Sequence, residues 1–385
     1  MLTMTSKTLK EVVQKMHLPV VVQRKDNWDP IFNKFMIQKT DEQMHEERQL
    51  VLRQLVAMTD RWHIVTLSLP NLFPVCNGCA IRDPGTERFA EVLSQCAALA
   101  HLDLSCNRIE AAGAATLLGV LSHCTALVHL NLSDNSNSIS SAGAAERLAG
   151  VLAQCTALAH LNLKHCDIGD AGTDRLARVL PQCPTLTHLN ITGNSIGPAG
   201  AAKLARVLGQ CAAAALAHLD LYGNNFGPAG IASIAGVLPQ CTSLVFLDLG
   251  DNECRAYGGI ARLVRVLPQC AGLTDLNLCE NYIGSDGSKI FAGLLTQCTA
   301  LTHLNLSETE IGREGAERFA SVLGKCTTLA VLTLFRNGID DVGKGRLRDS
   351  CRGPLSGLQL DSLESTDSDE EDSDEEEQDE FFGTE

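Results

Sequence analysis

Histidine, aspartate and asparagine recur at fixed positions in this chain, and they are the side chains best suited to chemistry. Six histidines each precede a Leu-x-Leu or similar triplet, at His101, His129, His160, His188, His218 and His303. The middle residues of the triplets form a second row, Asp103, Asn131, Asn162, Asn190, Asp220, Asp248, Asn277 and Asn305. A row of imidazoles indicates either metal chelation or a surface that titrates near neutral pH. Repeat duplication that copies one surface residue along the chain explains the same row without a ligand, and we favour it.

Cysteine is the other reactive residue that recurs. Nine of the 16 cysteines begin successive repeats between Cys96 and Cys326, at spacings of 28 to 31 residues. We interpret them as a ladder of buried, reduced thiols in a cytosolic protein, since disulfides belong to oxidising compartments. Cys76 and Cys79 form a lone CxxC pair, which is half of a structural zinc site. Because no second pair has matching spacing, we expect a loop there and no metal.

No constellation of residues predicts catalysis. Each histidine has an aspartate or asparagine nearby through repetition alone, so no Ser/His/Asp set has independent support. The chain also lacks GxxxxGK[ST] and a GxGxxG after a strand. We therefore expect neither an active site nor a cofactor, and predict that the protein is not an enzyme.

The elements that carry these residues follow from one repeated unit, typified by residues 96–123. Its Leu-x-Leu triplet predicts a short strand with one buried face, and the later Gly-x-x-x-Leu-x-x-Val-Leu run predicts an amphipathic helix. About eleven strands are expected, at 67–69, 102–104, 130–132, 161–163, 189–191, 219–221, 247–249, 276–278, 304–306, 332–334 and 358–360. The predicted fold class is α/β, a horseshoe-shaped solenoid with a parallel sheet on its concave face and helices on its convex face. An asparagine after most strands has an amide that satisfies backbone groups where the chain leaves the sheet.

The period and the LxxLxLxx(N/C) pattern resemble the ribonuclease-inhibitor-type leucine-rich repeat family over about residues 61–360. With the acidic segment that follows, the architecture also looks like the Ran GTPase-activating proteins. That resemblance implies the alternative function of activating a Ran-like small GTPase, although no residue of that family's GTPase-facing site aligns with a named position here. Ribonuclease inhibitors are a third interpretation, and the sensor region of NOD-like receptors is a fourth.

Composition divides the chain into three expected parts: a helical cap over 1–60, the solenoid over 61–360 and a disordered acidic tail over 361–385. The formal net charge of −15 lies mainly in the tail, which holds 14 Asp and Glu and no Lys or Arg. The remainder has 32 acidic and 31 basic residues and shows no basic stripe, so we expect no nucleic-acid partner. Without a secretory signal or a long apolar run, we expect no membrane contact and a cytoplasmic monomer, with a nuclear or perinuclear location as the alternative.

The departures from the copied concave surface are the better guide to function. Aromatic, acidic and arginine side chains gather in one region where the repeated histidine is partly replaced, at Tyr222, Phe246, Asp248, Asp251, Tyr257, Asp275, Glu280, Tyr282, Glu308, Phe335 and Arg336. Aromatic and arginine side chains are enriched at protein interfaces. We therefore predict a non-catalytic interaction scaffold that binds a protein through this part of its concave face. The alternative is that tyrosine only fills space near the loop turns.

Overall fold

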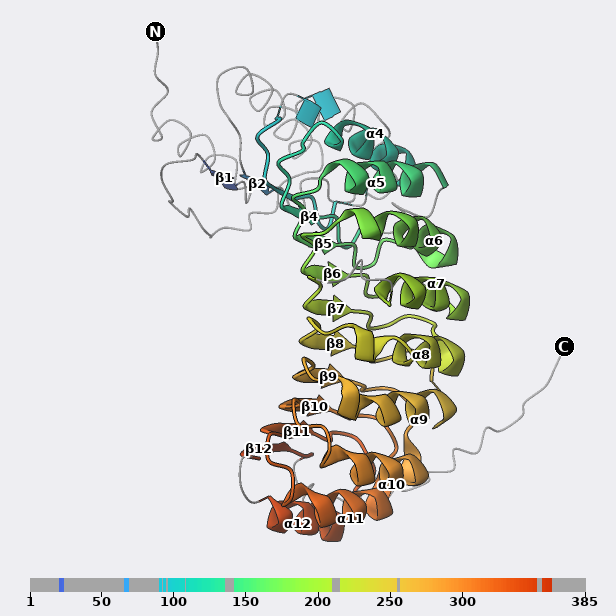
Figure 1. The fold of residues 1–385 in the computed structure, drawn as a ribbon, viewed down its shortest axis with the longest axis vertical. Coiled ribbons are helices and arrows are strands. Elements are labelled where there is room, and N and C mark those ends of the chain that lie inside the picture. The colour runs from blue at the N-terminus through green and yellow to red at the C-terminus, as the bar shows by residue number, and fades with distance from the viewer. Residues whose placement is uncertain are drawn as a thin grey trace, which may run out of the picture.

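A single curved sheet backed by helices forms the described part of the protein. This computed structural model describes residues 21–23, 66–68, 90–91, 93–94, 96–107, 109–135, 142–209, 215–254, 257–351 and 355–361. The strands lie side by side on the inner face of an arc, and the helices lie on its outer face (Figure 1). This arrangement confirms the predicted α/β leucine-rich repeat solenoid. Apart from Val21–Gln23 and Asp361, the expected cap and acidic tail lie outside the described residues.

The sheet runs in strict sequence order from β1 to β12. Its strands are β1 (Val21–Gln23), β2 (Thr66–Ser68), β3 (His101–Asp103), β4 (His129–Asn131), β5 (His160–Asn162), β6 (His188–Asn190), β7 (His218–Asp220), β8 (Phe246–Asp248), β9 (Asp275–Asn277), β10 (His303–Asn305), β11 (Val331–Thr333) and β12 (Gly357–Gln359). The strands from β2 to β12 are parallel and in register, so equivalent repeat positions are directly paired. Only β1 departs from this pattern among the described strands, pairing antiparallel with β2.

Each of the predicted strands begins and ends one residue earlier than expected. Where an asparagine follows the strand, its side chain binds the carbonyl of the second Leu. The Leu104 N–H still donates to Asn131 O of the next repeat. The Leu104 carbonyl instead accepts from Asn107 Nδ2 at 2.8 Å and Asn135 Nδ2 at 2.9 Å. The Asn135 Oδ1 also accepts the N–H groups of Asn107 and Ile109 at 3.0 Å. These buried amides therefore join adjacent repeats where the chain leaves the sheet.

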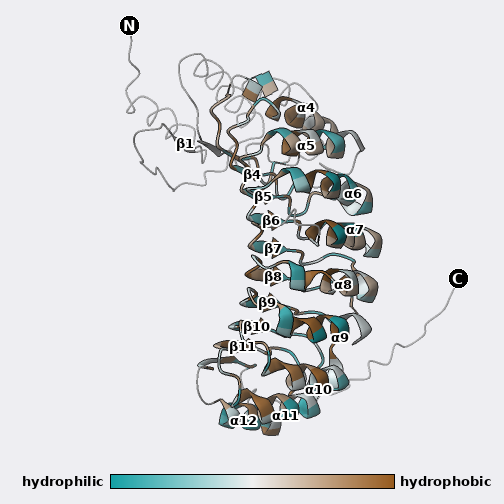
Figure 2. Cartoon of the chain, in the orientation of Figure 1, coloured by the Kyte–Doolittle hydropathy of each residue, from teal (hydrophilic) through white to brown (hydrophobic). Residues whose placement is uncertain are grey.

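The helices cover the sheet's outer face and have small and apolar residues toward it. They are α4 (Ala111–Leu121), α5 (Ala142–Gln154), α6 (Gly169–Val179), α7 (Pro198–Leu208), α8 (Gly227–Ala235), α9 (Tyr257–Val266), α10 (Gly284–Leu295), α11 (Gly312–Leu323) and α12 (Asp341–Ser350). Short 3-10 turns follow three of them: η1 (Leu180–Gln182), η2 (Leu238–Gln240) and η3 (Leu267–Gln269). In Figure 2 the helices carry both hydrophobic and hydrophilic residues, as expected for elements with one buried face.

One helix start shows how neighbouring repeats stabilise each other. Asp170, in the first turn of α6, accepts the N–H groups of Gly197 at 2.8 Å and Gly200 at 2.9 Å. These donors lie at the start of α7, where Pro198 fixes a helical backbone angle. A Cβ at Gly200 would lie 2.5 Å from Asp170 Oδ1 and 2.6 Å from an Ile196 methyl. Glycine is therefore needed for the carboxylate to reach the helix.

The cysteine ladder lies beside the leucine core. The repeated cysteines that the structure describes lie buried or half-buried. They donate to carbonyls of their own or the preceding repeat, as Cys183 does to Leu152 O at 3.5 Å. Burial raises the pKa of Cys183 and Cys155 to about 11. These thiols are therefore protonated and weak nucleophiles at neutral pH.

The last described repeat ends the sheet with a side chain. In the inner repeats, the N–H two residues after the second Leu donates to a carbonyl of the next repeat, as Glu308 does to Phe335 O at 2.9 Å. The equivalent N–H of Arg336 donates to the carboxylate of Asp361, at 2.9 and 3.0 Å. The Asp361 carboxylate thus replaces the carbonyl of a following repeat.

Candidate partner-binding surface

The histidine row forms a continuous stack along the concave face. The rings of His101, His129, His160, His188 and His218 stack at centroid distances of 4.3, 4.0, 4.0 and 4.1 Å. Parallel, in-register strands produce this stack, because equivalent residues lie about one strand spacing apart. Burial and the neighbouring imidazoles lower the pKa of His129 to about 4, and lower the pKa values of His160 and His188.

The stacked arrangement of the imidazoles does not suit metal binding. Zinc needs several ligand atoms converging at about 2.0–2.1 Å on one point, whereas these rings lie face to face. Within the described ranges, no group of three or more His, Cys, Asp or Glu side chains is placed to hold a metal ion. The stack ends at Phe246, whose ring lies 6.0 Å from that of His218.

The second row is a hydrogen-bonded ladder of amides and carboxylates. Asn190 donates to Asp220 at 2.9 Å, and Asn277 donates to Asp248 at 2.9 Å. Burial raises the pKa of Asp248 to about 6, although bonds from Asn277 and the Gly250 N–H oppose the shift. Asp248 is thus held within the sheet surface and is not a free, exposed anion.

The strongest departure from the repeat pattern lies where the chain leaves β7, β8 and β9. The Tyr222 hydroxyl donates to Glu280 Oε1 at 2.6 Å, across the intervening repeat. A Cβ on Gly250 would lie 2.7 Å from the Tyr222 ring and 2.9 Å from Cys279 Sγ. Glycine in the middle repeat therefore opens the path that the tyrosine ring follows. The hydrogen bond to Glu280 is the main cause that raises the pKa of Tyr222.

Acidic side chains continue along this edge. Asp251, Glu280, Glu308 and Arg336 share one repeat position and a left-handed backbone, with φ of 45°, 56°, 56° and 50°. Burial and the charges of Glu280 and Glu253 raise the pKa of Asp251. Arg336 Nη1 lies 3.1 Å from Glu308 Oε1, so it neutralises the end of this acidic row.

Two aromatic side chains near the acidic row are open to solvent. Tyr282 is 41% exposed and Phe335 is 39% exposed. The Tyr282 ring lies against Gly284, where a Cβ would approach within 3.0 Å. We define the acidic–aromatic rim as Tyr222, Asp251, Glu280, Tyr282, Glu308, Phe335 and Arg336.

Three other predicted binding residues belong to the strand rows. Phe246 belongs to the ring stack, Asp248 to the amide ladder, and Asp275 pairs with His303 Nδ1 at 3.0 Å and accepts from the Thr274 hydroxyl. Tyr257 begins α9, but its side chain lies outside the described residues. Ten of the eleven predicted residues thus divide between the strand rows and the rim.

A second contact between an aromatic side chain and a carboxylate of another repeat was not predicted from the sequence. His165 Nδ1 lies 2.8 Å from Asp134 Oδ1, and its ring occupies the space beside Gly193. A Cβ at Gly193 would approach the His165 ring within 2.0 Å. The glycine one repeat along, at the position that His165 itself occupies, was the available signal.

A family profile agrees with the repeat assignment. Residues 95–118, 154–177, 182–205 and 297–320 match the profile of the Leucine Rich repeat family. Similar solved structures include an internalin from Listeria monocytogenes, with 18% identity, a TM-score of 0.46, and coverage of 81% of this chain and 95% of the internalin chain. Another is Leiomodin-1 actin-binding site 2, with 20% identity, a TM-score of 0.31, and coverage of 35% and 76%. No curated protein matches the chain.

The four matched segments lie on strand–helix units of the sheet, the first spanning β3 and the start of α4. The helices of the described part are too short or too polar for a membrane crossing.

Proposed function

We propose that this leucine-rich repeat solenoid is a non-catalytic scaffold that binds a basic segment of a protein partner at the acidic–aromatic rim. The observation that carries the proposal is that Glu280 and Tyr282 follow β9 and Phe335 follows β11, on either side of the repeat that carries Glu308, with both rings exposed. Exposed aromatic rings next to carboxylates suit Lys and Arg side chains, which pair with the acids and stack on the rings.

Two other residues of the rim support a preformed binding site. Tyr222 is fixed by its bond to Glu280, and Arg336 is fixed through both its backbone and its side chain. A surface that is already ordered loses little conformational entropy on binding. The acids outnumber the one rim arginine, which itself pairs with Glu308. Electrostatic attraction of a basic partner is therefore expected, and salt should weaken it.

The test compares affinity capture from cell extract by the natural sequence and by a Glu280→Gln, Tyr282→Ala, Phe335→Ala variant. A Val245→Ala, Val342→Ala variant is the matched control, because these side chains are 37% and 47% exposed but lie outside the rim. We expect the rim variant alone to lose a partner that carries a Lys- or Arg-rich segment. Raising the salt concentration from 0.1 to 0.5 M should weaken that capture at least tenfold. The same set of partners with all three proteins would refute the rim as the binding site.

A separate assay covers the GTPase-activating alternative, which is tied to the ribonuclease-inhibitor-type resemblance. The intact chain is added at substoichiometric amounts to Ran loaded with GTP. Accelerated GTP hydrolysis would replace the scaffold proposal by that alternative.

A further inference from the structure

Three neighbouring helices of the outer face carry basic residues and no acidic ones. Lys203 and Arg206 lie on α7, Arg262 and Arg265 lie on α9, and α8 has no charged residue. The three arginines are exposed. Figure 1 shows α8 between α7 and α9 on the outside of the arc. We call Arg206, Arg262 and Arg265 the basic face.

No bulky side chain of α8 separates the two basic helices. Opposite its buried residues, α8 carries the small residues Ala229 and Ser233 and ends at Gly236. Arg262 lies against this helix end, since its Nη2 is 3.2 Å from the position of a Cβ at Gly236. The negative end of the helix dipole favours a cation there. Arg262 is therefore held over α8 while its side chain stays exposed.

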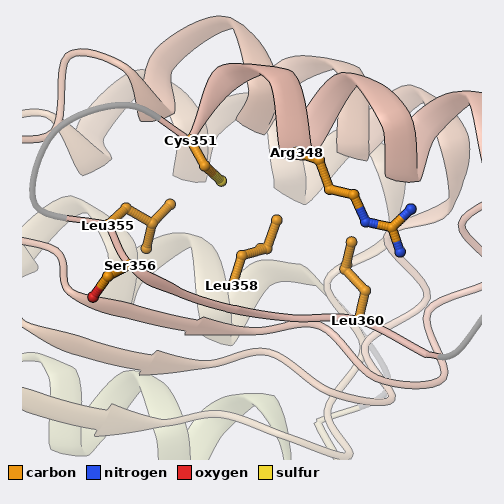
Figure 3. Close-up of a pocket in the computed structure, with 6 residues that line it drawn as sticks. All are labelled: Arg348, Cys351, Leu355, Ser356, Leu358 and Leu360. Carbon is orange, nitrogen blue, oxygen red and sulfur yellow. The ribbon is translucent and has the colours of Figure 1, made fainter.

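The basic face lacks the ion pairs of other arginines on the outer helices. Arg175 pairs with a carboxylate at 3.3 Å, and Arg346 does so at 2.8 Å. Among the described residues, no carboxylate pairs with the basic face. Arg348 also has no such pair there, but Asp349 follows it, and Figure 3 shows it beside Leu360 at the end of the array. The basic face thus concentrates positive charge that its own helices do not offset.

The inner edge of the same part of the solenoid has the opposite charge. The acidic–aromatic rim begins at Tyr222, between β7 and α8, and its Asp251 and Glu280 follow β8 and β9. We propose that the basic face of one copy of this protein binds the acidic–aromatic rim of a second copy. The inference rests on the function proposed for the rim, and it names the basic partner as this chain's own outer face.

Side-chain chemistry favours the rim of a second copy as the occupant of the basic face. Arginine pairs with carboxylates through two donors and also stacks on aromatic rings. The rim offers both, in the carboxylate of Glu280 and the exposed rings of Tyr282 and Phe335. Its one arginine, Arg336, already pairs with Glu308. The two surfaces therefore complement each other in charge and in type of side chain.

The positions of the two surfaces determine the kind of assembly. The rim lies where the chain leaves the strands, whereas the basic face lies on the outer helices (Figure 1). A copy that binds a neighbour through its rim keeps its own basic face free for a third copy. Such a heterologous contact produces open rows of copies that lengthen with concentration, in place of the monomer expected from the sequence. A small contact between charged surfaces is weak, and salt screens it.

Sedimentation velocity of the full chain tests the proposal, at low salt and at concentrations from about 1 to about 200 µM. An Arg206→Gln, Arg262→Gln, Arg265→Gln variant removes the basic face. The Glu280→Gln, Tyr282→Ala, Phe335→Ala variant removes the rim. The matched control, Arg147→Gln, Arg178→Gln, Arg318→Gln, removes three exposed arginines from α5, α6 and α11 and changes the net charge equally.

We expect the sedimentation coefficients of the natural sequence and the control to rise with concentration, and the rise to disappear at about 0.5 M salt. The rim variant and the basic-face variant should each stay monomeric. An equal mixture of the two variants should form dimers and nothing larger. The reason is that one variant keeps an intact rim and the other an intact basic face, so a single contact remains.

Three results would overturn the proposal: a natural chain that stays monomeric, a basic-face variant that associates as the control does, or a mixture of the variants that does not dimerise. A labelled oligo-arginine peptide distinguishes this failure from failure of the proposed function. If the peptide binds the natural chain but not the rim variant, and the natural chain stays monomeric, only the second copy is refuted. If the peptide does not bind either, both proposals fail. A labelled oligo-glutamate peptide that binds the basic face of a monomeric chain would assign that face to an acidic partner instead.

Discussion

Because the imidazoles are stacked, we expect acid to lower the free energy of unfolding of the solenoid. This loss should begin well above the pH at which ordinary carboxylates titrate. His129 has a pKa of about 4 in the folded protein, compared with 6.5 for an unperturbed histidine. Because its folded pKa is lowered, the unfolded chain binds the proton more tightly. The free energy of unfolding is therefore unaffected by this group above about pH 6.5, and falls as the pH drops from 6.5 toward 4.

The size of the effect follows from that shift. A shift of this size corresponds to a loss of about 2 kcal/mol between pH 7 and pH 5 for a fully shielded ring. The ring of His129 is half-buried, so solvent screening should reduce its own contribution to about 1 kcal/mol. The pKa values of His160 and His188 are lowered as well, and the three rings titrate as a coupled set. We therefore expect a total loss of about 1–2 kcal/mol.

A His129→Phe, His160→Phe variant isolates the cause, because phenylalanine already occupies the equivalent position in β8, next to His218. Urea denaturation followed by circular dichroism, at pH 7 and pH 5, measures the stability of each protein. The natural sequence should lose about 1–2 kcal/mol more than the variant. A His123→Gln variant is the control, because His123 is exposed outside the stack. Equal losses in the natural sequence and the phenylalanine variant would refute the reasoning.

Two further predictions test the contacts between repeats. Asn224→Ala removes a buried amide that bonds to Asn194 N, Ile196 N and carbonyls of two repeats. It should lower the free energy of unfolding by about 2–4 kcal/mol in urea denaturation, because each unmet buried group costs about 1–3 kcal/mol. The adjacent, exposed Asn225→Ala should change stability by less than about 0.5 kcal/mol; similar losses in both would contradict the amide-ladder argument. Gly250→Ala should displace the Tyr222 ring from Glu280 and lower the tyrosine's pKa toward about 10, which absorbance at 295 nm detects. Gly258→Ala, where the new Cβ would meet nothing within 4 Å, should leave the tyrosine titration unchanged.

The repeat architecture was predictable because its signals are local and periodic. The Leu-x-Leu triplet at 102–104 and the following glycine and apolar run define a strand and a helix within one unit. Stacking of equivalent units then follows from the need to cover both apolar faces. The one-residue offset of the strands was not predictable from the triplet alone. Beyond the strand, the amides of Asn107 and Asn135 bind the Leu104 carbonyl.

The arrangement of the predicted binding residues was harder to predict from the sequence. Tyr222 and Glu280 are 58 residues apart and belong to repeats that do not adjoin, so periodicity gives no reason to pair them. Their contact depends on Gly250 in the intervening repeat, because a side chain there would meet the tyrosine ring. Phe246 and Tyr222 both depart from the repeat, yet one joins a ring stack and the other lies at the rim. Composition identifies such departures, while backbone direction decides which of them share a surface.

The carboxylate of Asp361 also has a consequence for how the number of repeats can change in evolution. Between the inner described repeats, the N–H two residues after the second Leu donates to a backbone carbonyl, which any amino-acid sequence supplies. A duplicated unit inserted there restores the same bond on both sides. At Arg336 the acceptor is a side chain, so a unit added beyond it would displace the carboxylate that completes the rim. We therefore expect related chains to gain or lose whole units in the interior of the array, and to retain this terminal pair as the array lengthens.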